Sequence, residues 1–229
     1  MYHTIVIGGG CLGAATAISL QHKLNKKKKK EKVCLIDKSV LCAAESSRHS
    51  GIVRAANADQ DASIMAKESI DLWKNLETIW GVNISLEEFG AIWIAKKSND
   101  EKKTAWHTLS ERMKSIDLEF TEIGYNSAAE KCSTSLITSK EELYFYEPDA
   151  LQIDPSILRS TIYEALDYNN VEVLEKTEVE SLLYNGDKFT GCITSSGKVE
   201  GKNIVNAVGA WSPLLFQKVG LKIPITIEP

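Results

Sequence analysis

Three glycines near the amino terminus are spaced so that the backbone could bind a phosphate group. They follow a β-branched run at residues 4–7, which is typical of a buried parallel strand. Gly8 would permit a tight turn, Gly10 the approach of a diphosphate to the backbone, and Gly13 close packing of the following helix on the strand. A helix that starts here would add N–H groups and roughly half a positive charge. The spacing therefore predicts a dinucleotide diphosphate site.

An acidic residue after the next apolar run supports this interpretation. Residues 33–36 predict a second buried strand, and Asp37 follows it directly. An acid in this place binds the adenosine ribose in dinucleotide folds and normally comes about 20 residues after the last glycine. Here it comes somewhat later, because the lysine tract at residues 26–30 lengthens the connection. Asp37 favours an unphosphorylated ribose, hence FAD or NAD over NADP.

Composition and charge exclude several classes of protein. The 229 residues carry a net charge of -4, with 43% hydrophobic and 25% charged residues, as in ordinary globular proteins. Nucleic acid is not an expected partner, since it would need a basic surface. The lysine tract is interpreted as a solvated helix end rather than an anion-binding patch. We expect no membrane span, because no apolar run reaches about 18 residues. We expect no signal peptide either, since the first strand begins near residue 4.

The five cysteines do not form a recognisable framework. They are odd in number, scattered and without CxxC spacing, which predicts neither structural disulfides nor a metal site. A reducing compartment, the cytoplasm, is the expected location.

The middle of the chain predicts a mixed α+β segment. Residues 39–59 are expected to form an ordered loop, and residues 61–80 a helix with Met65 and Leu72 on its apolar side. Residues 90–95 predict a strand, and Ser98 with Glu101 a capping box for the next helix. The buried stripe of that helix would include Trp106, which is expected to be core rather than a cofactor platform.

The last third of the chain predicts a return to strands. Residues 143–146 and 171–174 are expected to be strands, with a helix opening at Pro155 after an Asp154 cap between them. Residues 178–184 and 188–194 predict a hairpin with a type I′ turn at Asn185-Gly186. Residues 203–208 predict another buried strand. This order does not suit a plain NAD dehydrogenase, and it favours a nucleotide-binding domain interrupted by a second domain.

Several blocks, in order along nearly the whole chain, carry a resemblance to a known family. The sequence resembles the D-amino-acid oxidase-like FAD-dependent oxidoreductases, which include glycine oxidase, sarcosine oxidase and dimethylglycine dehydrogenase. The blocks are Gly8 to Gly13 with Asp37, then residues 46–54, 89–95, 150–155, 177–179 and 205–212.

The resemblance implies a set of FAD contacts. Residues 46–54 would pass beside the isoalloxazine ring, residues 177–179 would lie against adenine, and residues 205–212 would form the second FAD fingerprint. The implied cofactor-binding residues are Gly8, Gly10, Cys11, Leu12, Gly13, Asp37, Lys38, Ser46, Ser47, His49, Ser50, Gly51, Val179, Ala207, Gly209 and Trp211.

Two residues of the loop at residues 46–54 are candidates for catalysis. A cation near the flavin would stabilise the anionic reduced ring, and it could instead bind a substrate carboxylate. Arg54 and His49 could each do this, although Arg54 could equally anchor the loop by an ion pair. Some members of the family attach FAD through a histidine of this loop, but a non-covalent cofactor is the favoured interpretation for His49.

The expected fold class is α/β: a Rossmann-type FAD-binding domain with an inserted α+β substrate domain, incomplete at the C-terminus. The expected pieces are residues 1–80 and 151–215 for FAD, 81–150 for substrate, and 216–229 for the start of a return to the substrate domain. Members of the family normally continue further, so a partner chain could supply the missing part.

The expected reaction is oxidation of the C–N bond of a small amino acid or N-methyl amine, with hydride transfer to flavin N5. Two alternatives stay open at this point: oxidation of a 2-hydroxy acid in the same fold, and a truncated nucleotide-binding fragment without turnover.

Overall fold

The computed structural model describes residues 1–132 and 139–225, which form two compact units. The first unit combines Met1–His49, Leu76–Ile84 and Pro155–Pro229, and the second combines Ser50–Asn75 and Ser85–Asp154. The chain thus leaves the first unit after His49, returns to it briefly over Leu76–Ile84, and returns again after Asp154. The functional division expected at residues 81 and 150 stays a prediction, as does the assignment of 216–229, whose last four residues lie outside the described part.

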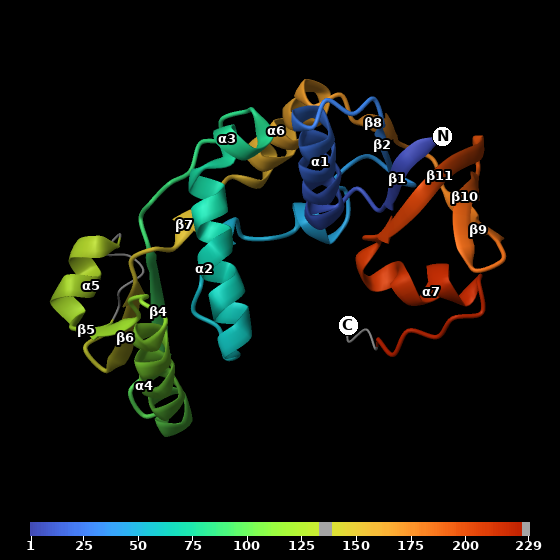
Figure 1. Ribbon diagram of the computed structural model, residues 1–229. Coiled ribbons are helices and arrows are strands. Elements are labelled where there is room, and N and C mark those ends of the chain that lie inside the picture. Colours follow the sequence, from blue (N-terminus) through green and yellow to red (C-terminus); the bar gives the residue numbers. More distant parts are fainter. Residues whose placement is uncertain (133–138, 226–229) are drawn as a thin grey trace. The chain divides into compact units, whose positions relative to one another are not determined.

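A six-stranded sheet forms the centre of the first unit (Figure 1). Its strand order is β8-β2-β1-β11-β10-β9. The four strands β8, β2, β1 and β11 are parallel, so their carboxyl ends lie along one edge, while β9 and β10 form an antiparallel hairpin beside β11. The bounds are β1 Tyr2–Ile7, β2 Val33–Ile36, β8 Glu172–Leu174, β9 Val179–Asn185, β10 Lys188–Thr194 and β11 Gly197–Asn206.

The central strands form where the apolar runs predicted them. Every residue of β2 is buried, and Ile5 and Val6 of β1 are also buried, as expected for strands covered on both faces. The strand predicted at residues 203–208 is confirmed only as a strand: β11 begins earlier, at Gly197, and ends at Asn206. The prediction that it is buried is wrong, because Asn203 is exposed and residues 204–206 are half-buried.

Four helical segments complete the first unit. Helix α1 follows β1 directly and ends within the lysine tract, which is exposed as expected for a solvated helix end. The buried side chain of Asn169 joins three of the helices: its Oδ1 contacts His22 on α1, and its Nδ2 donates to the carbonyls of Trp80 on α3 and Ala165 on α6. The bounds are α1 Cys11–Lys26, α3 Leu76–Trp80, α6 Pro155–Tyr168 and α7 Ser212–Gln217, with the 3₁₀ turns η1 Glu45–Ser47 and η2 Gly209–Trp211.

The predicted hairpin is confirmed, but its turn is not the predicted one. Asn185 pairs with Lys188 in the ladder, so the two loop residues are Gly186 and Asp187. Gly186 has a φ of +61°, whereas Asp187 has a negative φ. A type I′ turn needs a positive φ at both loop residues, so the type I′ prediction at Asn185-Gly186 is wrong.

The described residues of the second unit form two small antiparallel sheets and three helices. Strands β4, β6 and β5 form one sheet in this order, and β3 pairs with β7. The aromatic side chains of Trp93, Trp106, Phe120 and Phe145 pack edge-to-face or stacked. Phe120 and Phe145 are buried in the core of this unit and Trp106 is half-buried against it, so the core prediction for Trp106 is confirmed in part. The bounds are β3 Ile52–Val53, β4 Ala91–Lys96, β5 Thr121–Ile123, β6 Glu142–Glu147, β7 Leu151–Gln152, α2 Gln60–Lys74, α4 Asp100–Ser115 and α5 Tyr125–Lys131.

Two helix predictions in this region are wrong in detail. The helix expected over residues 61–80 is broken at Asn75 into α2 and α3, which belong to different units. Met65 and Leu72 do not face a core, since they are 68% and 54% exposed. The next helix is capped one residue later than predicted, because Asn99 rather than Ser98 accepts the Lys102 N–H. An Asn side chain caps a helix as well as a Ser side chain does, so the residue types alone could not predict which of these two neighbours is the cap.

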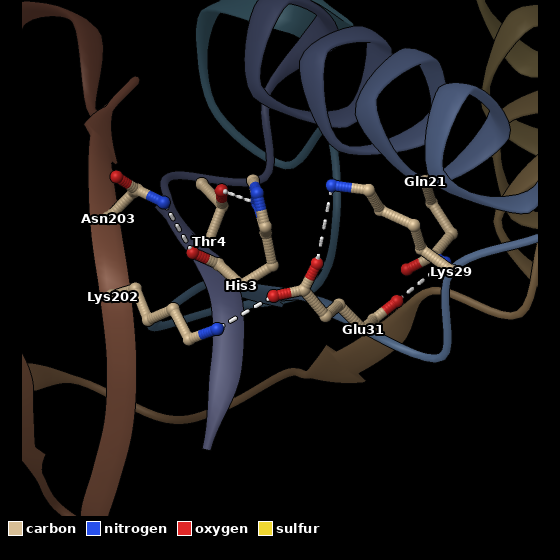
Figure 2. A network of polar contacts seen from close by, with 7 residues as sticks. All are labelled: His3, Thr4, Gln21, Lys29, Glu31, Lys202 and Asn203. Atoms are coloured by element: carbon tan, nitrogen blue, oxygen red, sulfur yellow. Dashed lines mark hydrogen bonds and ion pairs between the residues drawn. The ribbon is translucent and has the colours of Figure 1, made fainter. Parts of the chain in front are cut away.

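A polar network ties the start of the central sheet to the segment after the lysine tract (Figure 2). Glu31 Oε1 contacts Lys202 Nζ at 2.7 Å, and its other oxygen lies 3.9 Å from Lys29 Nζ. The hydrogen bond and charge of Lys202 lower the pKa of Glu31. The Asn203 amide donates to the His3 carbonyl across the β1–β11 pair at 2.7 Å. All five lysines of the tract are exposed, and among them Lys29 alone has an acidic partner within the described residues.

The glycine turn yields a test of the packing. A Cβ on Gly13 would lie 1.8 Å from the Gly8 carbonyl oxygen, a backbone atom that cannot move without displacing β1. We expect Gly13→Ala to lower the free energy of unfolding by about 3 kcal/mol or more, measured by urea denaturation. Gly124→Ala is the control: nothing lies within 4 Å of its Cβ and its φ is negative. A Gly13→Ala variant as stable as that control would refute the packing described here.

Candidate functional site

A cavity of about 820 Å³ lies in the first unit, at the carboxyl ends of the parallel strands. The ends of β1, β2 and β11 contribute Gly8, Asp37 and Ala207 to its wall. The chain order reverses at β1, whose neighbours are β2 on one side and β11 on the other. Open parallel sheets bind ligands at such a switch point, outside the carboxyl ends of the strands. The position therefore matches that of a nucleotide site.

Bare backbone forms the part of the cavity near the glycine turn. Gly8 has a φ of +104°, and a Cβ there would lie 2.4 Å from the Ala207 carbonyl oxygen. A Cβ on Gly10 would approach the Ser46 hydroxyl to 2.9 Å. Glycine is therefore required at residue 8 by conformation and contact, and at residue 10 it leaves space next to the backbone. This is the geometry expected of a diphosphate cradle.

The start of α1 suits an anion. The helix has 16 residues and no acidic residue in its first turn, so none of the helix's own side chains neutralises its positive end. Its cap, Gly10, offers no side chain, and the Cys11 N–H donates to the Ser46 hydroxyl at 3.0 Å. A group with negative oxygens beside this turn would gain from the helix dipole and from backbone N–H groups.

Asp37 links the glycine turn to the second strand. Its Oδ2 accepts the Gly9 N–H at 2.6 Å, and its Oδ1 accepts the Ser39 N–H at 2.7 Å. The carboxylate is thus held at the cavity wall, and each of its oxygens has a second lone pair that can accept a hydrogen bond. Lys38, the next residue, lies with its Nζ 4.8 Å from the centre of the Trp211 ring, and both residues line the same cavity.

Nine of the predicted cofactor residues are brought together at this cavity. They lie far apart in the sequence and share only their position on the cavity wall: Gly8, Gly10, Asp37, Lys38, Ser46, Val179, Ala207, Gly209 and Trp211. Their contact with a cofactor remains a prediction.

The other predicted residues do not line the cavity. Cys11 and Gly13 belong to α1 and are not among the lining residues, and Leu12 points to solvent with 82% exposure. The Ser47 hydroxyl donates to the Ala44 carbonyl at 2.9 Å, within its own turn. His49 is the last residue of the first unit, while Ser50, Gly51 and Arg54 belong to the second.

Sequence reasoning missed several residues of the cavity wall. They include Cys42 and Arg48 from the loop after β2, and Leu215 and Lys218 from α7 and the residue after it. Lys218 Nζ also donates to the Val179 carbonyl, 3.3 Å away. No spacing in the sequence marks these residues, because they reach the cavity through the path of the loop and the packing of α7. Within the described residues, no group of three or more His, Cys, Asp or Glu side chains could hold a metal ion, and no helix is both long and apolar enough to cross a membrane.

In the second unit, Arg54 is held by two contacts on the surface. Its guanidinium carbon lies 4.6 Å from the centre of the Trp93 ring, a cation–π arrangement. Its Nη1 donates to the Ala56 carbonyl at 2.5 Å. No acidic partner of Arg54 is among the ion pairs of the described residues, so the alternative of a loop-anchoring ion pair is not what this structure shows. Most of its donors remain available for a carboxylate.

A buried carboxylate organises the residues around Arg54. Glu147 at the end of β6 is 1% exposed, and its Oε1 accepts the N–H groups of Ala55 and Ala56 at 2.5 and 3.0 Å. Its Oε2 accepts the indole N–H of Trp93 at 3.2 Å. One side chain therefore fixes both the backbone after Arg54 and the ring on which its guanidinium lies.

Comparison with known proteins identifies the family. Residues 3–229 match the family model described as FAD dependent oxidoreductase, DAO. The chain belongs to this family. It is 23% identical, over 97% of its length, to 4-methylaminobutanoate oxidase (formaldehyde-forming) of Paenarthrobacter nicotinovorans, and 20% identical over its whole length to sarcosine oxidase subunit beta of Arthrobacter sp.

Solved structures show the same fold. L-proline dehydrogenase from P. horikoshii superposes with a TM-score of 0.84 and 25% identity, over 100% of this chain and 58% of that one. The chain spans 26% of the 4-methylaminobutanoate oxidase and 56% of the sarcosine oxidase subunit. The expected α/β class and the resemblance to FAD-dependent oxidoreductases of this family are thus confirmed.

The buried carboxylate gives a prediction for the second unit. In Glu147→Gln an amide NH₂ replaces one acceptor oxygen, so a buried N–H of Ala55, Ala56 or Trp93 loses its partner. We expect a loss of about 1–3 kcal/mol in the free energy of unfolding. Glu141→Gln, an exposed change just before the same strand, should alter it by less than about 0.5 kcal/mol. Equal stability of the two variants would show that the Glu147 contacts contribute nothing.

Proposed function

We propose that the first unit binds FAD in the cavity at the carboxyl ends of β1, β2 and β11. The diphosphate would lie against Gly8 and Gly10 at the start of α1, and the adenosine ribose against Asp37. The observation that carries this proposal is the meeting of the glycine turn with residues 207–211, about 200 positions later, on one cavity wall. Each stretch by itself is weak evidence, and their convergence supports one elongated ligand that touches both.

The residues present fit this cofactor. The volume is within the range of about 300–1,000 Å³ that is usual for ligand sites. Backbone without side chains and an unneutralised helix start are suited to a diphosphate, and a carboxylate at Asp37 is suited to a ribose with free hydroxyls. The backbone of Val179 and the Trp211 ring would border the rest of the cofactor.

The proposed reaction is oxidation of the C–N bond of a small amino acid or N-methyl amine. The names of the proline dehydrogenase, the sarcosine oxidase subunit and the methylaminobutanoate oxidase all state a substrate that carries both an amine and a carboxylate. When bound, FAD supplies the acceptor for the two electrons and the hydride of such an oxidation. The role of the chain's own residues would be to bind and orient the substrate so that its reacting carbon meets the flavin.

Arg54 and His49 are the proposed substrate-side residues. The Arg54 guanidinium has the planar donor geometry that pairs with a carboxylate in two parallel hydrogen bonds. Trp93, Ala56 and Glu147 hold that guanidinium in one place, which reduces the entropy lost when a substrate binds. His49 would be a second cation or hydrogen-bond donor in the same loop. We assign the second unit to substrate binding on this basis, and the additional length of the relatives, in the same or a partner chain, would complete the site.

Binding of FAD can be tested with a variant that keeps the backbone unstrained. Gly10 has a φ of -71°, and a Cβ there meets only the movable Ser46 side chain. Gly10→Ala should therefore fold, yet place a methyl group where the diphosphate approaches. We expect at least about tenfold weaker FAD binding by titration of flavin fluorescence, a loss of about 1.4 kcal/mol. Gly124→Ala should bind like the wild type. A wild-type chain that does not bind FAD would refute the proposal.

The proposed substrate class is tested by a separate measurement. With FAD bound, anaerobic addition of sarcosine, glycine or proline should bleach the visible flavin bands, and Arg54→Gln should raise the amine concentration needed by about tenfold or more. Lys97→Gln, a distant surface change in the same unit, is the control for charge. Bleaching by 2-hydroxy acids and not by amines would replace this substrate class with the alternative one.

A further inference from the structure

The segment after β8 lies beside the segment after β2 and is hydrogen-bonded to it. The Asp37 N–H donates to the Leu174 carbonyl at 3.0 Å, and the Thr177 N–H donates to the Asp37 carbonyl at 2.9 Å. The Lys176 N–H donates to the Ser39 carbonyl at 3.0 Å. Asp37 and Ser39 from one segment and Thr177 from the other line the cavity. The two strands therefore continue beyond their ends as one part of the cavity wall.

A carboxylate outside the lining residues holds the next part of this wall. Glu175 is half-buried, and its Oε1 accepts the Leu41 N–H at 2.7 Å. The same oxygen accepts the hydroxyl of Tyr163 on α6. Burial and the hydrogen bond to Glu175 raise the pKa of Tyr163, so this hydroxyl keeps its proton at neutral pH and remains a donor. Glu175 thus joins a helix, the segment after β8 and the loop after β2.

Leu41 carries this contact to the glycine turn. Its side chain is 0% exposed, and a Cβ on Gly9 would lie 2.3 Å from its Cδ2 atom. The next residue, Cys42, donates its N–H to the Gly9 carbonyl at 2.9 Å and has a φ of +55°, which is uncommon for a residue with a side chain. Such a conformation persists where the surrounding contacts hold it, and the Glu175 bond to Leu41 is one of these contacts.

We propose that Glu175 is a positioning residue for the adenosine half of the dinucleotide, because it fixes the loop of residues 38–44 against the glycine turn. This inference rests on the proposed binding of FAD in the cavity. The loop follows Asp37, where the ribose is proposed to bind, and its lining residues are Lys38, Ser39, Cys42, Ala43 and Ala44. A loop that is held in place before the ligand arrives loses less conformational entropy on binding. Glu175 therefore adds affinity without lining the cavity.

The test compares binding of FAD and of ADP, each titrated by calorimetry at a temperature at which circular dichroism shows the variants folded. Glu175→Ala removes the acceptor of the Leu41 N–H, and we expect it to weaken binding of FAD by about tenfold or more. Binding of ADP should weaken by the same factor, because ADP carries the half of FAD that the loop contacts. Glu175→Gln keeps an acceptor oxygen and should bind within about threefold of the wild type.

Glu172→Ala is the matched control, since Glu172 is an exposed acid three residues earlier in the same segment. It should bind both ligands like the wild type. Hydrogen exchange without ligand gives a second measurement: in Glu175→Ala the backbone N–H groups of residues 38–44 should exchange at least about tenfold faster, while those of β1 keep their wild-type rates. A role in general stability alone would speed exchange in β1 and in the loop alike.

Several outcomes would overturn the inference. They are wild-type affinity of Glu175→Ala for both ligands, weaker binding of FAD with unchanged binding of ADP, and equally faster exchange in β1 and the loop. If Glu175→Ala does not fold, Tyr163→Phe tests the same network, because it removes the other donor to Glu175; wild-type affinity and exchange in that variant would overturn the inference too. A wild-type chain that binds neither FAD nor ADP would instead refute the proposed function, and this inference with it.

Discussion

The contact between the start of α1 and the ends of β1 and β11 is the constraint on which the rest of the first unit depends. It is possible because Gly8 and Gly13 have no side chains: each ideal Cβ would come within 2.4 Å of a backbone oxygen. This approach brings the first turn of the helix to the carboxyl edge of the sheet. Near the glycine turn the cavity wall is then backbone from the ends of three strands, and side chains such as those of Lys38, Ser46 and Trp211 form the rest of it.

The same contact explains why the glycine turn suits an anion. The first turn of α1 carries no acidic residue, and the Cys11 N–H at its start donates to the Ser46 hydroxyl. The Cys42 N–H donates to the Gly9 carbonyl, which holds the loop after β2 against the turn. The turn, the helix start and this loop therefore form one side of the cavity together.

The second unit follows a different principle. Its central feature is a buried carboxylate, Glu147, which is stable there because three N–H groups donate to it. The cost of removing the charge from water is offset by these hydrogen bonds, and the result is a fixed position for Trp93 and for the cation above it. The result is an exposed arginine held by a buried acid through an aromatic ring, and the proposed contact of Arg54 with a substrate carboxylate rests on this geometry.

The sequence by itself determined the features that neighbouring residues control. The buried strands, the glycine turn, Asp37 at the end of β2, and the hairpin before β11 all follow from local hydrophobicity and backbone freedom. Tertiary structure decided the rest. Whether Asn99 or Ser98 caps α4, where the helix after Asp59 breaks, and whether Met65 is buried depend on which unit each segment packs against. Cys42 and Lys218 reach the cavity for the same reason: the path of a loop and the docking of a helix are set by contacts between distant segments, which no local pattern records.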